Sequence, residues 1–298
     1  MNTAAIRHNN APHARVLRHV LGLFKLRIGA AIAITALAGV AVSPGPPLPG
    51  WKIALIGLAV LLSSAAAGAF NQYVETDIDG RMKRTRRRAF VTGALRRTQA
   101  WLWVILALVA LSVGAAWWAL NPWAALYTFL GAFVYAVAYT VWLKRRTWLN
   151  IVIGGLAGSF AVLAGAAAVD PALGAVPLIL ALVLFLWTPP HFWSLAIAYR
   201  KDYEAARVPM LPVVIGDARG AQVILLHTML LVTASLVPAF LGMGRIYLAG
   251  AAAGGAWFLI TSWRLVRQPG PQAAMTNFHA SLGQLSLLLI AAIADAVL

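Results

Sequence analysis

Residues 52–88 read KIALIGLAVLLSSAAAGAFNQYVETDIDGRMKRTRRR, an apolar stretch that ends abruptly in a dense group of charges. Positions 53–74 carry no charged side chain. As a helix rising about 1.5 Å per residue, they would cross the roughly 30 Å hydrocarbon core of a bilayer. Three acidic and six basic residues then follow within 75–88. The stretch therefore predicts a membrane-spanning helix that delivers a charged segment to the membrane surface.

The rest of the chain has the same apolar character. Of its 298 residues, 61% are hydrophobic and only 11% are charged, and the mean hydropathy is +0.80. Soluble domains carry about 25% charged residues, so a soluble helical bundle is disfavoured. Backbone groups find no water partner in lipid, so apolar spans of this length must be helices. The composition predicts an all-α integral membrane protein, and the absence of cysteine excludes disulfides and thiolate chemistry.

Turn-forming residues divide the chain into nine predicted transmembrane helices. They form one bundle domain over 28–298, preceded by a basic tail over 1–27 that we expect to be a plain cytoplasmic segment. The predicted helices cover 28–45, 52–72, 99–120, 123–143, 149–169, 173–199, 220–241, 246–263 and 280–297.

The basic residues predict the orientation of this bundle. Of the 24 lysines and arginines, all but Lys52 and Arg245 fall in the tail or in loops on one predicted side. The excess of positive charge in cytoplasmic loops then places the N-terminus in the cytoplasm. A basic membrane face accounts for the formal charge of +16, so no nucleic-acid partner is needed.

The acidic residues give the clearest chemical signal. Five of the eight fall in two groups on the predicted cytoplasmic side, at 75–79 and 202–204. Asn71, Glu75 and Asp79 are four residues apart and would stack on one helix face, whereas Asp77 would face elsewhere. Oxygen-bearing side chains in such a column suit a hard cation such as magnesium. The alternative is that the acids only neutralise the basic run at 81–88.

Basic residues predicted on the same membrane face could complete a site for a diphosphate, because guanidinium and ammonium groups bind phosphate oxygens. The alternative for many of them is contact with lipid headgroups. The candidates are Arg84, Arg88, Lys144, Arg145, Arg200 and Lys201.

These residues lie in stretches that resemble the intramembrane aromatic prenyltransferase superfamily and, within it, the protoheme IX farnesyltransferases (heme O synthases). The first aspartate-rich motif is matched by NQYVETDID at 71–79 with MKRTRRR at 82–88. Four further stretches point to the same branch, and the resemblance covers roughly residues 20–295. They are FKLR at 24–27, YTVWLKRRTWLN at 139–150, TPPHFW at 188–193 and KDYEAARVPMLP at 201–212.

The resemblance implies a magnesium-assisted transfer of the farnesyl group of farnesyl diphosphate to a vinyl group of heme b, with addition of water, to form heme O. It also implies roles for particular residues. Magnesium would be held by Asn71, Glu75, Asp79 and Asp202, which with Lys144 are the catalytic candidates. The diphosphate would be bound by Lys25, Arg27, Arg84, Arg88, Lys144, Arg145 and Lys201.

The acceptor side is predicted with less support from spacing. His191 follows Pro189 and Pro190 inside a predicted span, where an imidazole could bind heme iron or pair within the bundle. Tyr139 and Tyr203 are the other candidates for heme contact. The short basic tail favours a bacterial inner membrane, with the mitochondrial inner membrane as the alternative. The resemblance further implies hand-over to a downstream heme-modifying or oxidase-assembly protein.

Two other functions stay open at this point. One is prenylation of a different aromatic acceptor, of the 4-hydroxybenzoate or chlorophyllide type. The second motif departs from the superfamily pattern, since Ala198 stands four residues before Asp202, and this departure suits the heme branch. The other is a secondary transporter, which would place ionisable groups near the bilayer midplane and show paired repeats. The predicted acids lie near one interface and no repeat is evident.

Overall fold

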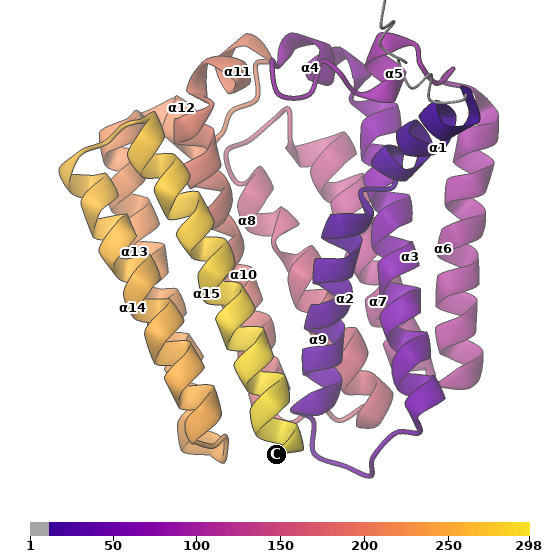
Figure 1. The fold of residues 1–298 in the computed structure, drawn as a ribbon, viewed down its shortest axis with the longest axis vertical. Helices are drawn as coiled ribbons and strands as arrows, with labels where there is room; N and C mark the ends of the chain where they lie inside the picture. The colour runs from indigo at the N-terminus through magenta and orange to yellow at the C-terminus, as the bar shows by residue number, and fades with distance from the viewer. Residues whose placement is uncertain (1–11) are drawn as a thin grey trace, which may run out of the picture.

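The computed structural model describes residues 12–298, with side chains from Val16 onward. The first part of the predicted tail, including Arg7 and His8, lies outside the described residues. Figure 1 shows a bundle of long helices running side by side, with the C-terminus at the end opposite α4 and α11.

The prediction of nine apolar helices is confirmed within residues 12–298. Among the eight spans after the first, three are composite, because a long helix continues into a second helical segment or follows a short one. In chain order the spans contain α2 (Leu26–Ala41), α3 (Gly50–Val74), α6 (Gln99–Ala119), α7 (Pro122–Phe133) with the π-helix η1 (Val134–Leu143), α8 (Asn150–Gly154) with α9 (Leu156–Val169), α10 (Ala175–Ala198), α13 (Asp217–Leu236) with η2 (Val237–Leu241), α14 (Arg245–Arg267) and α15 (Pro271–Val297).

Short helices join the spans at one end of the bundle, which lies at the top of Figure 1. This end also carries the basic loops, so the charged segments predicted to share a membrane face do lie together. The short helices are α1 (Pro12–Leu23), α4 (Thr76–Arg81), α5 (Ala89–Thr92), α11 (Arg200–Ala205) and α12 (Leu211–Ile215).

The two terminal spans differ from the predicted boundaries. The last helix begins at Pro271 rather than at residue 280, because proline at the first helical position is compatible with a helix start. At the other end of the chain, residues 12–23 of the predicted tail form α1, and the apolar stretch runs from Val16 to Ala41 with a break before α2. The tail prediction missed a helix that contains hydrophobic residues.

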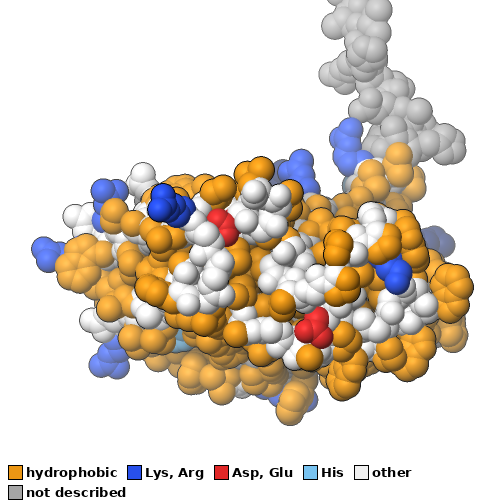
Figure 2. All heavy atoms as spheres, turned by 90° about the horizontal axis from the view of Figure 1, so that it is seen from below, with side chains coloured by type: hydrophobic (Ala, Val, Ile, Leu, Met, Phe, Trp, Pro, Cys, Tyr) orange, Lys and Arg blue, Asp and Glu red, His pale blue; other side chains and the backbone are white. Residues whose placement is uncertain are grey.

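The surface of the bundle is apolar, as expected for contact with lipid. Trp118 is 88% exposed and Phe240 is 86% exposed, whereas Asn277 and Gln284 are fully buried. Figure 2 shows the end opposite α4 and α11, where hydrophobic side chains cover most of the surface and charged ones are few. Exposed apolar surface of this extent marks a membrane-contacting protein.

Small residues and one acidic cap hold helices together. A side chain at Gly165 of α9 would collide with the carbonyl oxygen of Ala36 in α2, so glycine permits the close crossing of these helices. At the other side of the bundle, the Asp295 carboxylate of α15 accepts hydrogen bonds from the first N–H groups of α14. Its donors are Gly244 N (2.5 Å), Ile246 N (3.1 Å) and Tyr247 N (3.2 Å).

Candidate active site

Asn71, Glu75 and Asp79 form one buried column at the charged end of the bundle. The helix changes direction at Glu75, where α3 ends and α4 begins. The spacing of four survives this break, because Glu75 N donates to Asn71 O (3.0 Å) and Asp79 N donates to Glu75 O (2.8 Å). The three residues are 3%, 0% and 2% exposed. The column predicted from spacing is therefore present and faces the protein interior.

Each member of the column is bound by a basic side chain from a different part of the chain. These contacts explain how two carboxylates and an amide remain buried together, since buried charge must be paired. The contacts join Lys25 Nζ to Asn71 Oδ1 (2.8 Å), Lys144 Nζ to Glu75 Oε2, and Arg88 Nη1 to both carboxylate oxygens of Asp79 (2.6 and 2.8 Å).

The π-helix η1 supplies the wall beside this column. Such wide turns are rare and often occur at functional sites. The rings of Tyr135 and Tyr139 stack with centroids 5.7 Å apart. Lys25 Nζ lies 5.8 Å from the Tyr135 ring centroid, and Lys144 Nζ lies 5.5 Å from that of Tyr139. The wall therefore presents two aromatic faces to the cations that bind the column.

Tyr135 also takes part through its hydroxyl group, and Thr140 contacts the column directly. Lys25 Nζ donates to Tyr135 Oη (3.3 Å), and Asn71 Nδ2 donates to Thr140 Oγ1 (3.1 Å). Neither residue was among the predicted site residues. Hydrophobic periodicity gives no sign of a π-helix, so the sequence alone could not show which side of residues 134–143 meets the column.

Asp202 lies on a separate element and contacts the segment that follows the column. It is 7% exposed in α11, and its Oδ2 accepts the backbone N–H of Arg84 (3.2 Å), which ties the segment between α4 and α5 to α11. The Arg84 guanidinium lies 5.9 Å from the Tyr199 ring. Tyr203 is buried in a hydrophobic cluster against which Tyr139 packs. The two predicted motifs therefore meet at this end of the bundle.

Other predicted phosphate ligands lie outside this cluster. Arg145 forms a two-bond ion pair with Asp77 at the surface, with both distances 2.8 Å. The Arg145 hydrogen bonds hold the pKa of Asp77 below its usual range. Arg27 and Lys201 are exposed, and within residues 12–298 their side chains form no hydrogen bond or ion pair.

Arg200 is committed to a structural role. Its guanidinium donates to Asp217 Oδ1 (2.7 Å), Glu204 Oε1 (2.7 Å) and the Pro212 carbonyl oxygen (3.1 Å). These bonds join α11, α12 and the start of α13, so they organise the loop that carries Asp202. The prediction that Arg200 faces a diphosphate has no support in these contacts.

Of the four predicted magnesium ligands, three lie in the column: Asn71, Glu75 and Asp79. In the part of the chain that the structure describes, no three histidine, cysteine or carboxylate side chains form a metal-binding group. The column offers two carboxylates and an amide oxygen. Glu75 Oε1 is buried and has no hydrogen-bond partner among the described residues. An unpartnered buried carboxylate oxygen is the kind of ligand that magnesium prefers.

His191 lies deeper in the bundle, in α10, which runs through both prolines without a break. Its ring is stacked between Trp187 (4.2 Å between centroids) and Phe278 (4.4 Å). Ser281 Oγ lies 2.7 Å from His191 Nδ1 and donates its only proton to the Phe278 carbonyl oxygen (2.6 Å). His191 Nδ1 must then be the donor, so Nε2 carries the lone pair.

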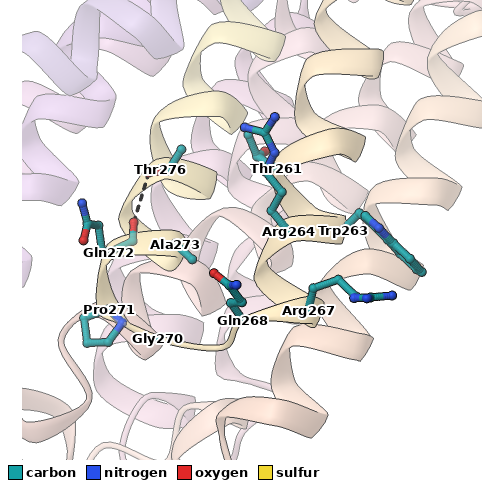
Figure 3. Close-up of a pocket in the computed structure, with 10 residues that line it drawn as sticks. All are labelled: Thr261, Trp263, Arg264, Arg267, Gln268, Gly270, Pro271, Gln272, Ala273 and Thr276. Atoms are coloured by element: carbon teal, nitrogen blue, oxygen red, sulfur yellow. Dashed lines mark hydrogen bonds between the residues drawn. The ribbon is translucent and has the colours of Figure 1, made fainter.

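A cavity lies elsewhere, between α14 and α15 at the charged end. It has a volume of about 820 Å³ and opens to the surface. Figure 3 shows that Gln268, the residue after α14, points toward α15 while Trp263 and Arg267 point away from it. None of the predicted site residues lines this cavity. Buried paired charge, rather than cavity size, therefore identifies the candidate site.

The fold is that of a polytopic membrane protein with a buried charge cluster at one end of the bundle. Comparison with known proteins makes this specific. The model of the UbiA prenyltransferase family matches residues 32–288. The chain belongs to this family and is a prenyltransferase.

Named relatives are similar over nearly the whole chain. Protoheme IX farnesyltransferase 2 of Paramagnetospirillum magneticum is 56% identical over 282 residues, covering 95% of this chain and 98% of the relative. Protoheme IX farnesyltransferase 1 of the same organism is 49% identical, covering 93% and 98%.

Solved structures show the same fold. A digeranylgeranylglyceryl phosphate synthase superposes with a TM-score of 0.77 at 18% identity, covering 95% of this chain and 99% of that one. A UbiA homolog from Archaeoglobus fulgidus bound to DMAPP and Mg²⁺ superposes with a TM-score of 0.70 at 18% identity, covering 92% and 99%.

Proposed function

We propose that this chain transfers the farnesyl group of farnesyl diphosphate to heme b and forms heme O. The observation that supports heme b as the acceptor is the similarity to a relative named protoheme IX farnesyltransferase 2, which is 56% identical over nearly the full length of both chains. Prenylation of a 4-hydroxybenzoate or chlorophyllide is less well supported, because none of the relatives reported above carries such a name. The buried, charge-paired column supports the donor site.

The proposed reaction breaks the bond between C1 of the farnesyl chain and the diphosphate oxygen, and the diphosphate leaves with the bonding electrons. C1 then bonds to the terminal carbon of a heme vinyl group, which leaves a positive charge on the vinyl carbon next to the ring. A water oxygen bonds to that carbon and releases one proton. The products are heme O, diphosphate and one proton, so atoms and charge balance.

The residues of the column would bind the leaving group. Asn71, Glu75 and Asp79 would hold magnesium, which when bound supplies positive charge that stabilises a departing diphosphate. Lys144 binds Glu75, and Arg88 binds Asp79. Both cations could donate to phosphate oxygens once magnesium is bound to these carboxylates in their place. The two cations would stabilise charge that develops on the diphosphate. Asp202, Arg84, Arg145, Arg27 and Lys201 remain further candidates of the proposal.

His191 would contact the acceptor. Its Nδ1 proton is held by Ser281, so the lone pair on Nε2 is available as a ligand for heme iron. Tyr139 and Tyr203 would contact heme from the side of the charged column. Trp187 and Phe278, which cover both faces of the imidazole, would have to move for heme to approach.

We further propose that the column faces the cytoplasm of a bacterial cell with the chain in the inner membrane. The concentration of basic loops at this end of the bundle supports this orientation. Farnesyl diphosphate, which is water-soluble at its diphosphate end, would then enter from the side where the column lies. The product would pass to a downstream heme-modifying or oxidase-assembly protein.

Expression in membranes that lack heme O tests the proposal directly. Mass spectrometry of extracted hemes should detect heme O with the wild-type chain, and should detect none with Glu75→Gln or Asp79→Asn. Asp77→Asn is the matched control, because it removes an acid of the same segment that lies at the surface. Absence of heme O despite good expression of the wild-type chain would refute the proposed acceptor. Full activity of both column variants would refute the proposed site.

A further inference from the structure

The α1 helix leaves an apolar face uncovered. Val16, Leu17 and Leu21 are 50%, 57% and 47% exposed, although α1 packs on its other side through Leu23, which is buried. Positions 17 and 21 are one helical turn apart and share a face, whereas Arg18, about 100° around the helix from Leu17, lies on its polar flank and is exposed. Within the described residues, nothing covers the Leu17–Leu21 side of α1.

The position of α1 indicates what this face meets. Its 12 residues extend about 18 Å, which is too short to cross a bilayer. In Figure 1 it runs obliquely at the charged end of the bundle, whereas α2 follows the bundle axis. Leu26 and Ile28 at the start of α2 are also exposed and belong to the lipid-facing surface. The apolar face of α1 therefore continues the lipid-facing surface at the level of the headgroups.

The segment that joins α1 to α2 carries a residue of the candidate site. Lys25 adopts the left-handed conformation (φ 48°, ψ 43°), which residues with a side chain rarely adopt, and its Nζ reaches Asn71. Gln72 Nε2 holds the preceding turn by donating to the carbonyl oxygens of Gly22 (3.1 Å) and Leu23 (2.9 Å). The conformation of Lys25 thus depends on where α1 ends.

We propose that α1 is a membrane-surface anchor, whose Leu17–Leu21 face inserts among the lipid headgroups and so holds Lys25 against Asn71. The partner is the lipid of the leaflet on the charged side of the bundle. The anchoring requires no knowledge of the reaction. The role of Lys25 as a positioning residue for the diphosphate is a separate part of the proposal, and it rests on the proposed function.

The anchoring is measured by the depth of spin labels in vesicles. The chain has no cysteine, so Leu17→Cys, Leu21→Cys and Arg18→Cys each give one labelling site. The protein is reconstituted into phosphatidylcholine vesicles that contain phosphatidylglycerol. Labels at 17 and 21 should be more accessible to oxygen than to a water-soluble nickel chelate, and the label at 18 should show the reverse. Equal access of the nickel chelate to all three labels would overturn the anchor.

The coupling to Lys25 is measured by kinetics. Lys25→Met should raise the KM for farnesyl diphosphate by about 10-fold, the size of a lost charged hydrogen bond. The double variant L17N/L21N should raise it in the same direction, and L17M/L21M, which keeps the face apolar, should restore the wild-type value. Adding L17N/L21N to Lys25→Met should have little further effect, because both act through one contact.

The label depths and the kinetics can refute the anchor and its link to Lys25 independently. If the labels insert but L17N/L21N leaves the KM unchanged, α1 is an anchor and its link to Lys25 is refuted. If the wild-type chain produces no heme O, the proposed function fails, and the label depths still decide whether α1 lies in the membrane surface.

Discussion

The ion pair between Lys144 and Glu75 allows a quantitative test of how the column is held. Glu75 is fully buried, Lys144 Nζ contacts its Oε2, and its Oε1 has no partner among the described residues. Lys144→Met would therefore leave both carboxylate oxygens buried and unpaired. Removal of one partner of a buried pair costs about 3–5 kcal/mol. We expect a loss of this size in the free energy of unfolding.

Substitution of the other partner, Glu75→Gln, should lower the free energy of unfolding by less. The Lys144 side chain is 12% exposed and its long stem can carry the ammonium group toward water after Glu75→Gln. We expect a loss of about 1–2 kcal/mol in that variant, which is the size of one hydrogen bond to a charged group. The double variant should resemble Glu75→Gln, because it contains no buried unpaired charge. A double-mutant cycle then gives the coupling between the two residues.

The assay is reversible unfolding of the purified protein in mixed micelles, followed by tryptophan fluorescence. Arg145→Met is the matched control, because it breaks an ion pair of the same loop whose two side chains are 43% and 49% exposed. Exposed pairs contribute about 0–1 kcal/mol. A loss below about 1 kcal/mol for Lys144→Met, or one no larger than that of the control, would refute the reasoning.

Three further outcomes are expected. Asp295→Ala removes the hydrogen-bond acceptor at the start of α14 and should lower the unfolding free energy by about 1–2 kcal/mol. Asp170→Ala, in an exposed turn, is the control and should change it less. Equal losses in the two variants would contradict the capping role of Asp295. Asp77, whose pKa is held low by its arginine partner, contributes stability that is present above the unfolded pKa of about 3.9 and lost as the pH falls through the lower folded pKa. The contribution of Asp77 to stability should thus be constant from pH 7 to 5, and Asp77→Asn should reduce the loss seen below about pH 4 in the same unfolding assay. Ser281→Ala removes the acceptor for His191 Nδ1 and should weaken heme b binding, followed by its Soret absorbance, by about 10- to 100-fold, while unchanged binding in His191→Ala would exclude this histidine as the iron ligand.

The sequence predicted the features that depend on neighbours along the chain. Nine apolar stretches predicted nine helices, because burial of backbone groups in lipid leaves the helix as the only solution. The spacing of Asn71, Glu75 and Asp79 predicted a column, and the local backbone hydrogen bonds preserve it through the break at Glu75. The separation of Asp77 from the column was predicted for the same reason, and the structure shows that its partner is Arg145.

The partners of these residues could not be predicted in this way. Six basic residues were equivalent candidates on one membrane face, yet Arg88 binds the column while Arg200 organises α11 and α12. The roles of the site residues stay predictions. Tyr135 was missed because the π-helix that turns it toward Lys25 has no signature in hydrophobic periodicity. The helix α1 was missed because its basic residues suggested a solvated tail.

The sequence by itself determined the nine membrane-spanning helices of residues 12–298 and the acidic column at their charged end, because span length and i, i+4 spacing are local properties. Only the tertiary structure decided which cations bind the column, since Lys25 and Asn71 are 46 residues apart and Lys144 and Glu75 are 69 apart. Such contacts depend on how the helices pack. A buried carboxylate takes the cation that packing brings within reach, and its nearest basic residue in the sequence has no advantage.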